Sequence, residues 1–177
     1  MRAVIVYESV YGNTREVAEA VADGVHTAQP EAVVRCLPAA EAGPDVTRTA
    51  DLLVVGGPTH MHGMTSALSR RMAVAAEKKK DPDGTAERTA AAEGNGPGLR
   101  GWFHSLPEGG PGVRAAAFDT RADIRASGGA ANGIARRLSH HHYDVVARPE
   151  GFVVEDSEGP MRAGELERAK AWGAALI

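Results

Sequence analysis

The chain has little with which to form disulfides, bind nucleic acid or cross a membrane. A single cysteine, Cys36, among 177 residues excludes an internal disulfide and is typical of a reducing compartment. Since 20 Lys and Arg stand against 23 Asp and Glu, the excess positive charge typical of nucleic-acid binders is missing. No apolar run approaches the length of a bilayer span, and the opening run, AVIVY, is shorter than a signal-peptide core. We therefore expect a cytoplasmic protein with no nucleic-acid partner and no membrane insertion.

Aromatic residues are scarce as well, at 5% of the chain, so the core must be built mostly from aliphatic side chains. Hydrophobic residues make up 43% of the 177 positions, which is enough for one core and too little for two. We expect residues 1–177 to form a single domain.

Short aliphatic runs alternate with segments of helical periodicity. Four runs are apolar almost throughout, as in strands buried on both faces: residues 2–7, 32–37, 51–57 and 113–118. A fifth, residues 143–156, contains Pro149 and Gly151, which are expected to interrupt the strand with a bulge or to divide it into two parts. Apolar residues at helical spacing mark four helices, around Val17 to Val25, Leu68 to Ala76, Ala131 to Leu138 and Leu166 to Leu176. This alternation predicts an α/β fold with a doubly wound parallel sheet.

A long segment between the third and fourth strands, at about 78–112, is rich in Gly, Pro and charge and is expected to be a loop insertion that folding can do without. It contains one possible helix, around Leu99 to Leu106. Trp102 and Phe103 could pin this insertion to the body or cover a ligand, and pinning is favoured. A Gly-x-Gly-x-x-Gly match at 96–101 does not follow a strand, so it does not indicate a dinucleotide site.

The turn after the first strand carries the strongest functional signal. It reads SVYGNT, Ser9 to Thr14, and leads from a buried strand into a helix. Backbone N–H groups and the helix dipole converge on such a turn, and its hydroxyl and amide side chains add donors. No Lys lies within the turn, which argues against the phosphate loop of nucleotide triphosphatases. The turn therefore predicts a site for a phosphomonoester; the alternative is a polar turn in which Asn13 caps the helix.

Two further turns are expected at the same edge of the sheet. The sequence GGPTHMHG follows the third strand and FDTRAD ends the fourth, and ligands of doubly wound sheets lie outside the carboxyl ends of the strands. His60, Met61, His62 and Phe118 are the candidates for stacking on a flat ring, and His60, His62 and Arg121 would bring positive charge to it. The run SHHHYD, in contrast, is typical of a solvated helix C-terminus, and no metal site is expected.

The SVYGNT and GGPTH motifs resemble those of the flavodoxin family, and the resemblance extends over the whole chain. Tyr11 replaces the family's usual hydroxyl residue, and the aromatic residues that usually flank the flavin are missing. The resemblance implies a flavodoxin-like, five-stranded sheet in the order 2-1-3-4-5, with FMN bound noncovalently. The implied FMN-binding residues are Ser9, Val10, Tyr11, Gly12, Asn13 and Thr14 at the phosphate, and Pro58, Thr59, His60, Met61, His62, Gly63, Phe118, Asp119, Thr120 and Arg121 around the isoalloxazine.

Three functions remain open on this reading. The first is an FMN-binding carrier that acts in electron transfer, favoured by the small size and the lack of a second cofactor motif. The second is an FMN-dependent NAD(P)H:quinone oxidoreductase. The third is a flavodoxin-like scaffold that has lost FMN. The sequence does not identify the redox partner, which could be a protein or a small-molecule acceptor.

Overall fold

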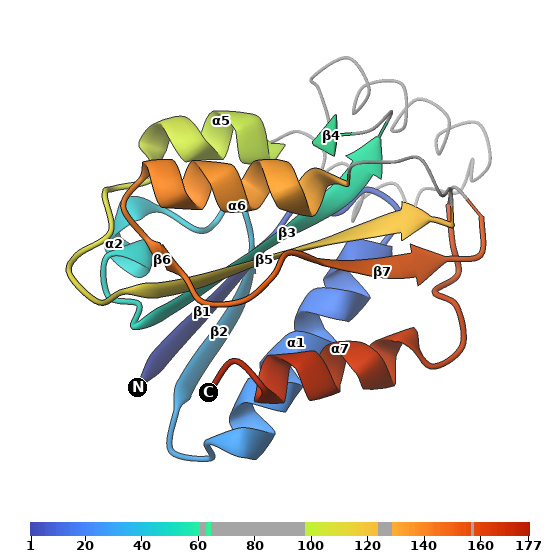
Figure 1. Cartoon of the computed structure of the whole chain (residues 1–177), viewed down its shortest axis with the longest axis horizontal. Helices are drawn as coiled ribbons and strands as arrows, with labels where there is room; N and C mark the ends of the chain where they lie inside the picture. The colour runs from blue at the N-terminus through green and yellow to red at the C-terminus, as the bar shows by residue number, and fades with distance from the viewer. Residues whose placement is uncertain (61–62, 65–97, 124–128, 157) are drawn as a thin grey trace.

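The computed structural model describes residues 1–60, 63–64, 98–123, 129–156 and 158–177. Its centre is a parallel sheet whose strands follow the order β2-β1-β3-β5, and β6 and β7 lie one after the other along the outer edge of β5 (Figure 1). The strands are β1 Arg2–Tyr7, β2 Val33–Pro38, β3 Leu52–His60, β5 Arg114–Ala122, β6 Asp144–Val145 and β7 Glu150–Val154. With β6 and β7 counted as two parts of one fifth strand, this is the 2-1-3-4-5 order expected from the sequence.

Helices cover both faces of the sheet, as a doubly wound fold requires. The α1 helix, Asn13–Ala28, and the α7 helix, Glu165–Ala174, lie side by side on one face. The other face carries α5, Gly98–Ser105, α6, Ala130–His140, and the short α2, Pro44–Thr47 (Figure 1). Alternate strand residues point to opposite faces, so the strands contribute to two separate apolar clusters. Val4 and Leu53 belong to the cluster under α5 and α6, and Ile5 and Val54 to the one under α1 and α7.

The strands exceed their predicted bounds at the edge where the site is expected. The β3 strand continues through Pro58 and Thr59, where a loop was predicted, because Pro58 lies opposite Thr120 of β5. Its end then pairs with a two-residue antiparallel strand, β4 Gly63–Met64, which the sequence did not predict. The predicted break near Pro149 is confirmed, since this residue lies between β6 and β7. Gly151, in contrast, lies within β7, opposite Asp119.

The second half of the expected insertion is part of the core. Leu99, Trp102, Phe103 and Leu106 are all at most 6% exposed and belong to the cluster under α5 and α6. The indole Nε1 of Trp102 donates a hydrogen bond of 2.7 Å to the carbonyl of Ala42. The pinning role is thereby confirmed. Because removing α5 would uncover this face of the sheet, we now expect folding to require residues 98–106, contrary to the expectation from the sequence. Residues 78–97 of the insertion, and the predicted helix around Leu68, lie outside the described residues.

None of the helices in the described part of the chain is long and apolar enough to cross a membrane.

Candidate functional site

The carboxyl ends of three neighbouring strands meet at one edge of the sheet. Tyr7 at the end of β1 pairs with Gly56 of β3, which pairs in turn with Phe118 of β5. Because the three strands are parallel, the segments that follow them lie next to one another. These are the three segments from which the sequence predicted a composite site.

The turn after β1 is compact and largely buried. Ser9 is 1% exposed and Thr14 2%, and Ser9 Oγ accepts a hydrogen bond of 3.1 Å from the amide of Gly12. Gly12 has a φ of 90°, a left-handed conformation that favours glycine, which explains why glycine stands at this position. The hydroxyl of Thr14 lies 2.8 Å from that of Thr120 and ties the turn to the end of β5. The Ser9 hydroxyl keeps its own proton to donate, so the turn holds a ready donor in a fixed place.

The helices that begin at this edge differ in how their N-termini are capped. The Glu8 carboxylate accepts a hydrogen bond of 2.8 Å from the amide of Leu99 in the first turn of α5. The start of α6 is capped in the same way. Thr59 Oγ1 accepts a hydrogen bond of 2.9 Å from the amide of Ala130, and Asp119 Oδ2 accepts one of 2.8 Å from the amide of Ala131. Strand ends thus cap two helices that follow later in the chain.

The α1 helix lacks such a cap. Its N-cap residue, Gly12, has no side chain, and among the described residues no side chain accepts a hydrogen bond from the amides of Asn13 or Thr14. Unsatisfied N–H groups at a helix start carry the positive end of the helix dipole and favour an anion. The α7 helix also starts without a side-chain cap, but its first turn carries two acidic residues, Glu165 and Glu167, against one in α1. Acidic side chains disfavour an anion, so α1 is the helix start better suited to a phosphate.

Asn13 has a different role from the one that the sequence predicted. It is the first residue of α1 rather than its N-cap, so the alternative of a capping asparagine is wrong. Its Nδ2 donates a hydrogen bond of 2.9 Å to the carbonyl of Glu158, in the segment that follows β7. A Cβ on Gly159 would come within 2.3 Å of Asn13 Oδ1, so glycine is needed for this close approach. The Asn13 side chain thus uses one of its two N–H groups to join the turn to a distant segment.

The second expected loop is an antiparallel hairpin of β3 and β4. Thr59 lies opposite Met64, and His60 opposite Gly63. The Thr59 hydroxyl oxygen already accepts the amide of Ala130. Met61 and His62 lie outside the described residues, and nothing is assigned to the side chain of His60.

The third segment sends its side chains to two faces of the sheet. Phe118 is fully buried and packs edge-on against Phe152 and Trp172, with ring centroids 6.1 and 6.2 Å apart. The expectation that its ring stacks on a ligand is therefore wrong, because the ring fills the core beneath α1 and α7. Thr120 points to the same face and reaches Thr14.

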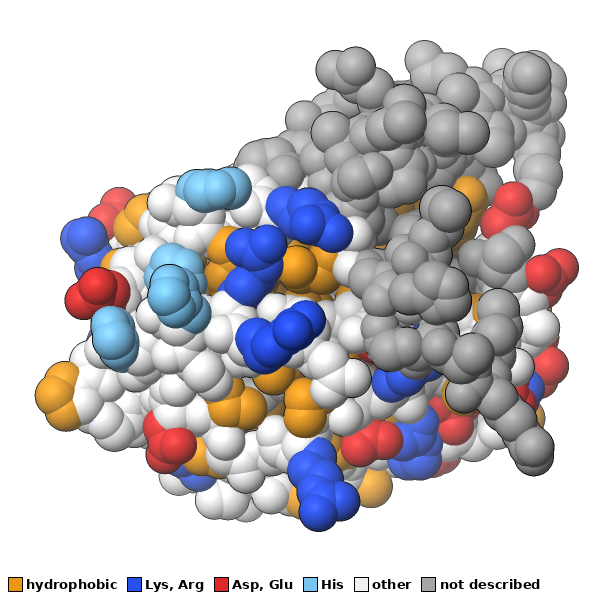
Figure 2. All heavy atoms as spheres, turned by 45° about the horizontal axis from the view of Figure 1, so that its top comes forward, with side chains coloured by type: hydrophobic (Ala, Val, Ile, Leu, Met, Phe, Trp, Pro, Cys, Tyr) orange, Lys and Arg blue, Asp and Glu red, His pale blue; other side chains and the backbone are white. Residues whose placement is uncertain are grey.

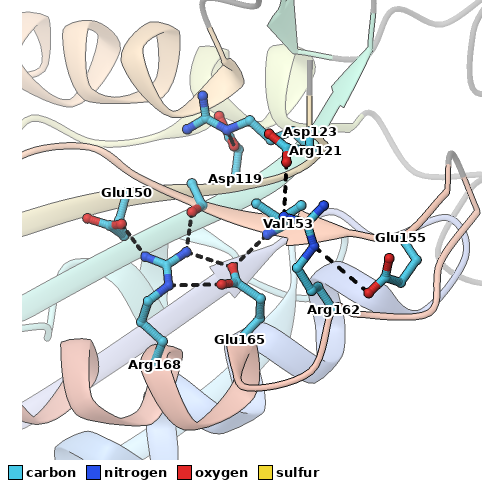
Figure 3. Close-up of polar contacts among 10 residues, drawn as sticks. Asp119, Arg121, Asp123, Glu150, Val153, Glu155, Arg162, Glu165 and Arg168 are labelled. Carbon is cyan, nitrogen blue, oxygen red and sulfur yellow. Dashed lines mark hydrogen bonds and ion pairs between the residues drawn. The ribbon is translucent and has the colours of Figure 1, made fainter. Parts of the chain in front are cut away.

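Asp119 and Arg121 point to the opposite face and form an ion pair beside the start of α6 (Figure 3). Asp119 is fully buried, and its Oδ1 lies 2.8 Å from Arg121 Nε without an aligned hydrogen bond. The guanidinium fits where Gly129 and Gly151 leave space, since a Cβ on Gly151 would overlap it at 1.7 Å. The sequence suggested that Arg121 brings positive charge to this edge, but that charge is balanced by the carboxylate of Asp119.

Burial raises the pKa of the Asp119 carboxyl, while the amide of Ala131 and the charge of Arg121 act in the opposite direction. Sequence reasoning missed the capping by Asp119 and Glu8, because the partner amide of Glu8 lies 91 residues away in the chain. An acidic residue directly at the end of a buried strand was the only available signal.

The histidine run lies at the end of α6, whose last residue is His140. In the part of the chain that the structure describes, no group of three or more His, Cys, Asp or Glu side chains could hold a metal ion. A helix C-terminus, with its negative dipole end, remains the explanation for this run.

A doubly wound α/β protein with an anion-binding turn after its first strand is the class that this fold and site define. The family model for flavodoxin matches residues 5–98, more than half of the chain. The chain belongs to the flavodoxin family.

Solved structures agree with this assignment at the level of the fold. A flavodoxin from the domain Archaea is 20% identical, with a TM-score of 0.65 over 99% of this chain and 96% of that one. Flavodoxin 1 from Bacillus cereus is 15% identical, with a TM-score of 0.65 over 99% and 97%. A flavodoxin, WrbA-like protein from Agrobacterium tumefaciens is 21% identical, with a TM-score of 0.55 over 99% and 94%. No curated protein matches the chain.

Proposed function

We propose that this chain is an FMN-binding redox protein that acts in electron transfer. The observation that carries the proposal is the start of α1, which is left without a side-chain cap while the starts of α5 and α6 are capped from the strand ends. Membership in the flavodoxin family supports FMN as the ligand.

The residues present at the sheet edge fit the two ends of FMN. The phosphate would be held by the turn Ser9–Thr14, through the amides at the start of α1 and the hydroxyls of Ser9 and Thr14. The isoalloxazine would lie between the β3–β4 hairpin and the end of β5, residues 58–63 and 118–121, with backbone rather than the Phe118 ring as the contact from β5. Bound FMN would supply reversible uptake of one or two electrons, for exchange with a partner protein or a small-molecule acceptor.

The test begins with the visible absorption spectrum of the protein as purified and after addition of FMN. The proposal expects a yellow protein, or one that becomes yellow and retains FMN through gel filtration. A colourless preparation that ignores added FMN would contradict it and favour the scaffold that has lost FMN. Steady oxidation of NAD(P)H in the presence of a quinone, without any protein partner, would instead favour the FMN-dependent NAD(P)H:quinone oxidoreductase.

A further inference from the structure

A hollow lined by arginines lies on the face of the molecule that carries α5 and α6. Its volume is about 980 Å³, and its described lining includes Arg100 from α5, Arg136, Arg137 and His140 from α6, and the apolar Met64 and Ala130. Figure 2 shows Lys and Arg side chains gathered around hydrophobic atoms on this face, with histidines beside them. A concave apolar floor with a basic rim is the shape of a binding surface rather than of a solvated helix face.

The position of these arginines follows from the period of α6. Residues 129, 133, 136, 137 and 140 share one stripe of the helix, opposite the buried Ile134 and Leu138. The stripe begins with the small residues Gly129 and Gly133, which leave space above the floor of the hollow, and it ends with Arg136 and Arg137, which bring charge to its rim. The arginine stripe is therefore displayed by a helix whose other side is fixed in the core.

The rim is held in place by contacts within the fold. Arg100 Nη2 donates a hydrogen bond of 3.0 Å to the carbonyl of Met64, and the guanidinium of Arg137 lies 5.7 Å from the centroid of the Phe103 ring. Such contacts reduce the side-chain entropy that binding would otherwise remove. Arg136 is exposed on the same stripe.

Charge distinguishes this hollow from the rest of the chain. No Asp or Glu is among its described lining residues, whereas the whole chain has a net charge of -3. The guanidinium groups of Arg136 and Arg137 on a net acidic protein form a local positive field that attracts an acidic surface and repels a basic one.

The hollow also adjoins the candidate site. Ala130 lines the hollow, and its amide donates to Thr59 Oγ1 of the β3–β4 hairpin, 2.9 Å away. Met64, the last residue of β4, lines the hollow too. A molecule seated in the hollow would therefore touch the hairpin that is expected to flank the isoalloxazine.

We propose that this hollow is the docking surface for an acidic redox partner protein. The inference rests on the proposed function, because it identifies the class of partner with which the FMN site exchanges electrons. A protein fits better than a membrane, which presents a flat surface, or a nucleic acid, whose phosphate backbone offers nothing to an apolar floor. An acidic loop with one apolar side chain would match both the rim and the floor.

The test measures binding of an acidic [2Fe–2S] ferredoxin by calorimetry, with the basic haem protein cytochrome c as its counterpart. The ferredoxin is expected to bind at an ionic strength of about 0.02 M and to be released at about 0.2 M, while cytochrome c binds at neither. Charge reversal in Arg136→Glu/Arg137→Glu is expected to weaken ferredoxin binding at least 10-fold, and Arg136→Gln/Arg137→Gln to weaken it by less. Circular dichroism and FMN titration of each variant establish that fold and site are retained.

The matched control is Arg35→Glu/Lys170→Glu. It changes the net charge of the protein by the same amount as Arg136→Glu/Arg137→Glu, but at residues of β2 and α7 that do not line the hollow. Its ferredoxin affinity is expected to stay within twofold of the wild type. Equal losses in both double variants, or no ferredoxin binding at low ionic strength, would overturn the proposal.

The other possible occupants are tested in the same way. Pyrophosphate binding that depends on Arg136 and Arg137 and does not compete with the ferredoxin would make the hollow a small-anion site. Arginine-dependent binding to phosphatidylserine vesicles that exceeds binding to the ferredoxin would make it a membrane contact. Either result would overturn the proposal. Ferredoxin binding needs no FMN, so failure of the proposed function alone would leave this readout intact.

Discussion

Thr14 is the residue on which the phosphate assignment depends most. Its buried hydroxyl bonds to Thr120 at 2.8 Å and so is held at the start of α1. A hydrogen bond to a charged group contributes about 1.5–3 kcal/mol, or roughly 10- to 150-fold in Kd. We therefore expect Thr14→Ala to weaken FMN binding by that factor. The affinity for riboflavin, which has no phosphate, should stay nearly unchanged. Flavin fluorescence titration measures both affinities.

Thr14→Ser is the matched control, because serine keeps the hydroxyl and loses only a methyl group. It is expected to bind FMN within a few-fold of the wild type. If Thr14→Ala weakened both ligands equally, the phosphate would have to lie elsewhere.

Asp119 is expected to stabilise the start of α6 through its acceptor oxygen more than through its charge. Asp119→Ala removes the acceptor of the Ala131 amide and the partner of Arg121, and buried groups left unpaired cost about 1–3 kcal/mol. Asp119→Asn keeps an acceptor oxygen and removes a buried charge, so it should lower the free energy of unfolding by less. Urea denaturation compares the two variants. If both lost the same stability, the charge would be the more important property.

Among the elements, β7 and α7 are joined by one cluster of charged side chains (Figure 3). Glu165 Oε2 accepts the amide of Val153 at 2.7 Å and Arg168 Nη2 at 2.6 Å, and Arg168 also contacts Glu150. The guanidinium of Arg168 lies 4.5 Å from the centroid of the Phe152 ring. The cluster thus attaches the last helix to an edge strand of the sheet.

This cluster makes stability depend on pH with a definite sign. Burial alone would raise the pKa of Glu165, but the hydrogen bonds from Arg168 and Val153, together with the nearby positive charge, outweigh it and lower the pKa. A carboxyl whose pKa is lowered by folding stabilises the folded state above its unfolded pKa, about 4.3 for Glu. That stabilisation is lost as the pH falls through the folded pKa.

We therefore expect Glu165→Gln to lower the free energy of unfolding by about 1–3 kcal/mol at neutral pH. The difference from the wild type should shrink below a pH of about 4.3. Urea denaturation across the acid range measures this. Glu167→Gln, an exposed neighbour in the first turn of α7, is the control and should show no such difference. A difference that persisted in acid would contradict the role assigned to the charge of Glu165.

The α5 helix is expected to be indispensable for folding, because its Trp102 side chain is part of the core. This side chain is 3% exposed, packs edge-on against Phe103 and donates to the Ala42 carbonyl. Trp102→Ala should destabilise by about 3–5 kcal/mol, a large part of the stability of an ordinary domain. Trp102→Phe should cost less, and the exposed His104→Ala less than about 0.5 kcal/mol. Unfolding followed by circular dichroism would contradict this account if Trp102→Ala were as stable as the wild type.

Across the whole molecule, the sequence predicted the features that depend on local pattern. Continuous aliphatic runs predicted the parallel strands, and the motif Ser9 to Thr14 predicted a polar turn between the first strand and the first helix. It could not predict that Asn13 bonds to Glu158, since that contact depends on how a segment 145 residues away packs against the turn. Nor did composition show that Gly151 makes room for Arg121, because this requires the register of β5 against β7.

The central claim is that the edge of the sheet binds FMN by its phosphate, at the uncapped start of α1. The most direct test compares the affinities of the wild-type protein for FMN and for riboflavin by fluorescence titration. Several charge-assisted hydrogen bonds to the phosphate predict that FMN binds at least about 100-fold more tightly. Equal affinity for the two flavins, or no binding of either, would contradict the account.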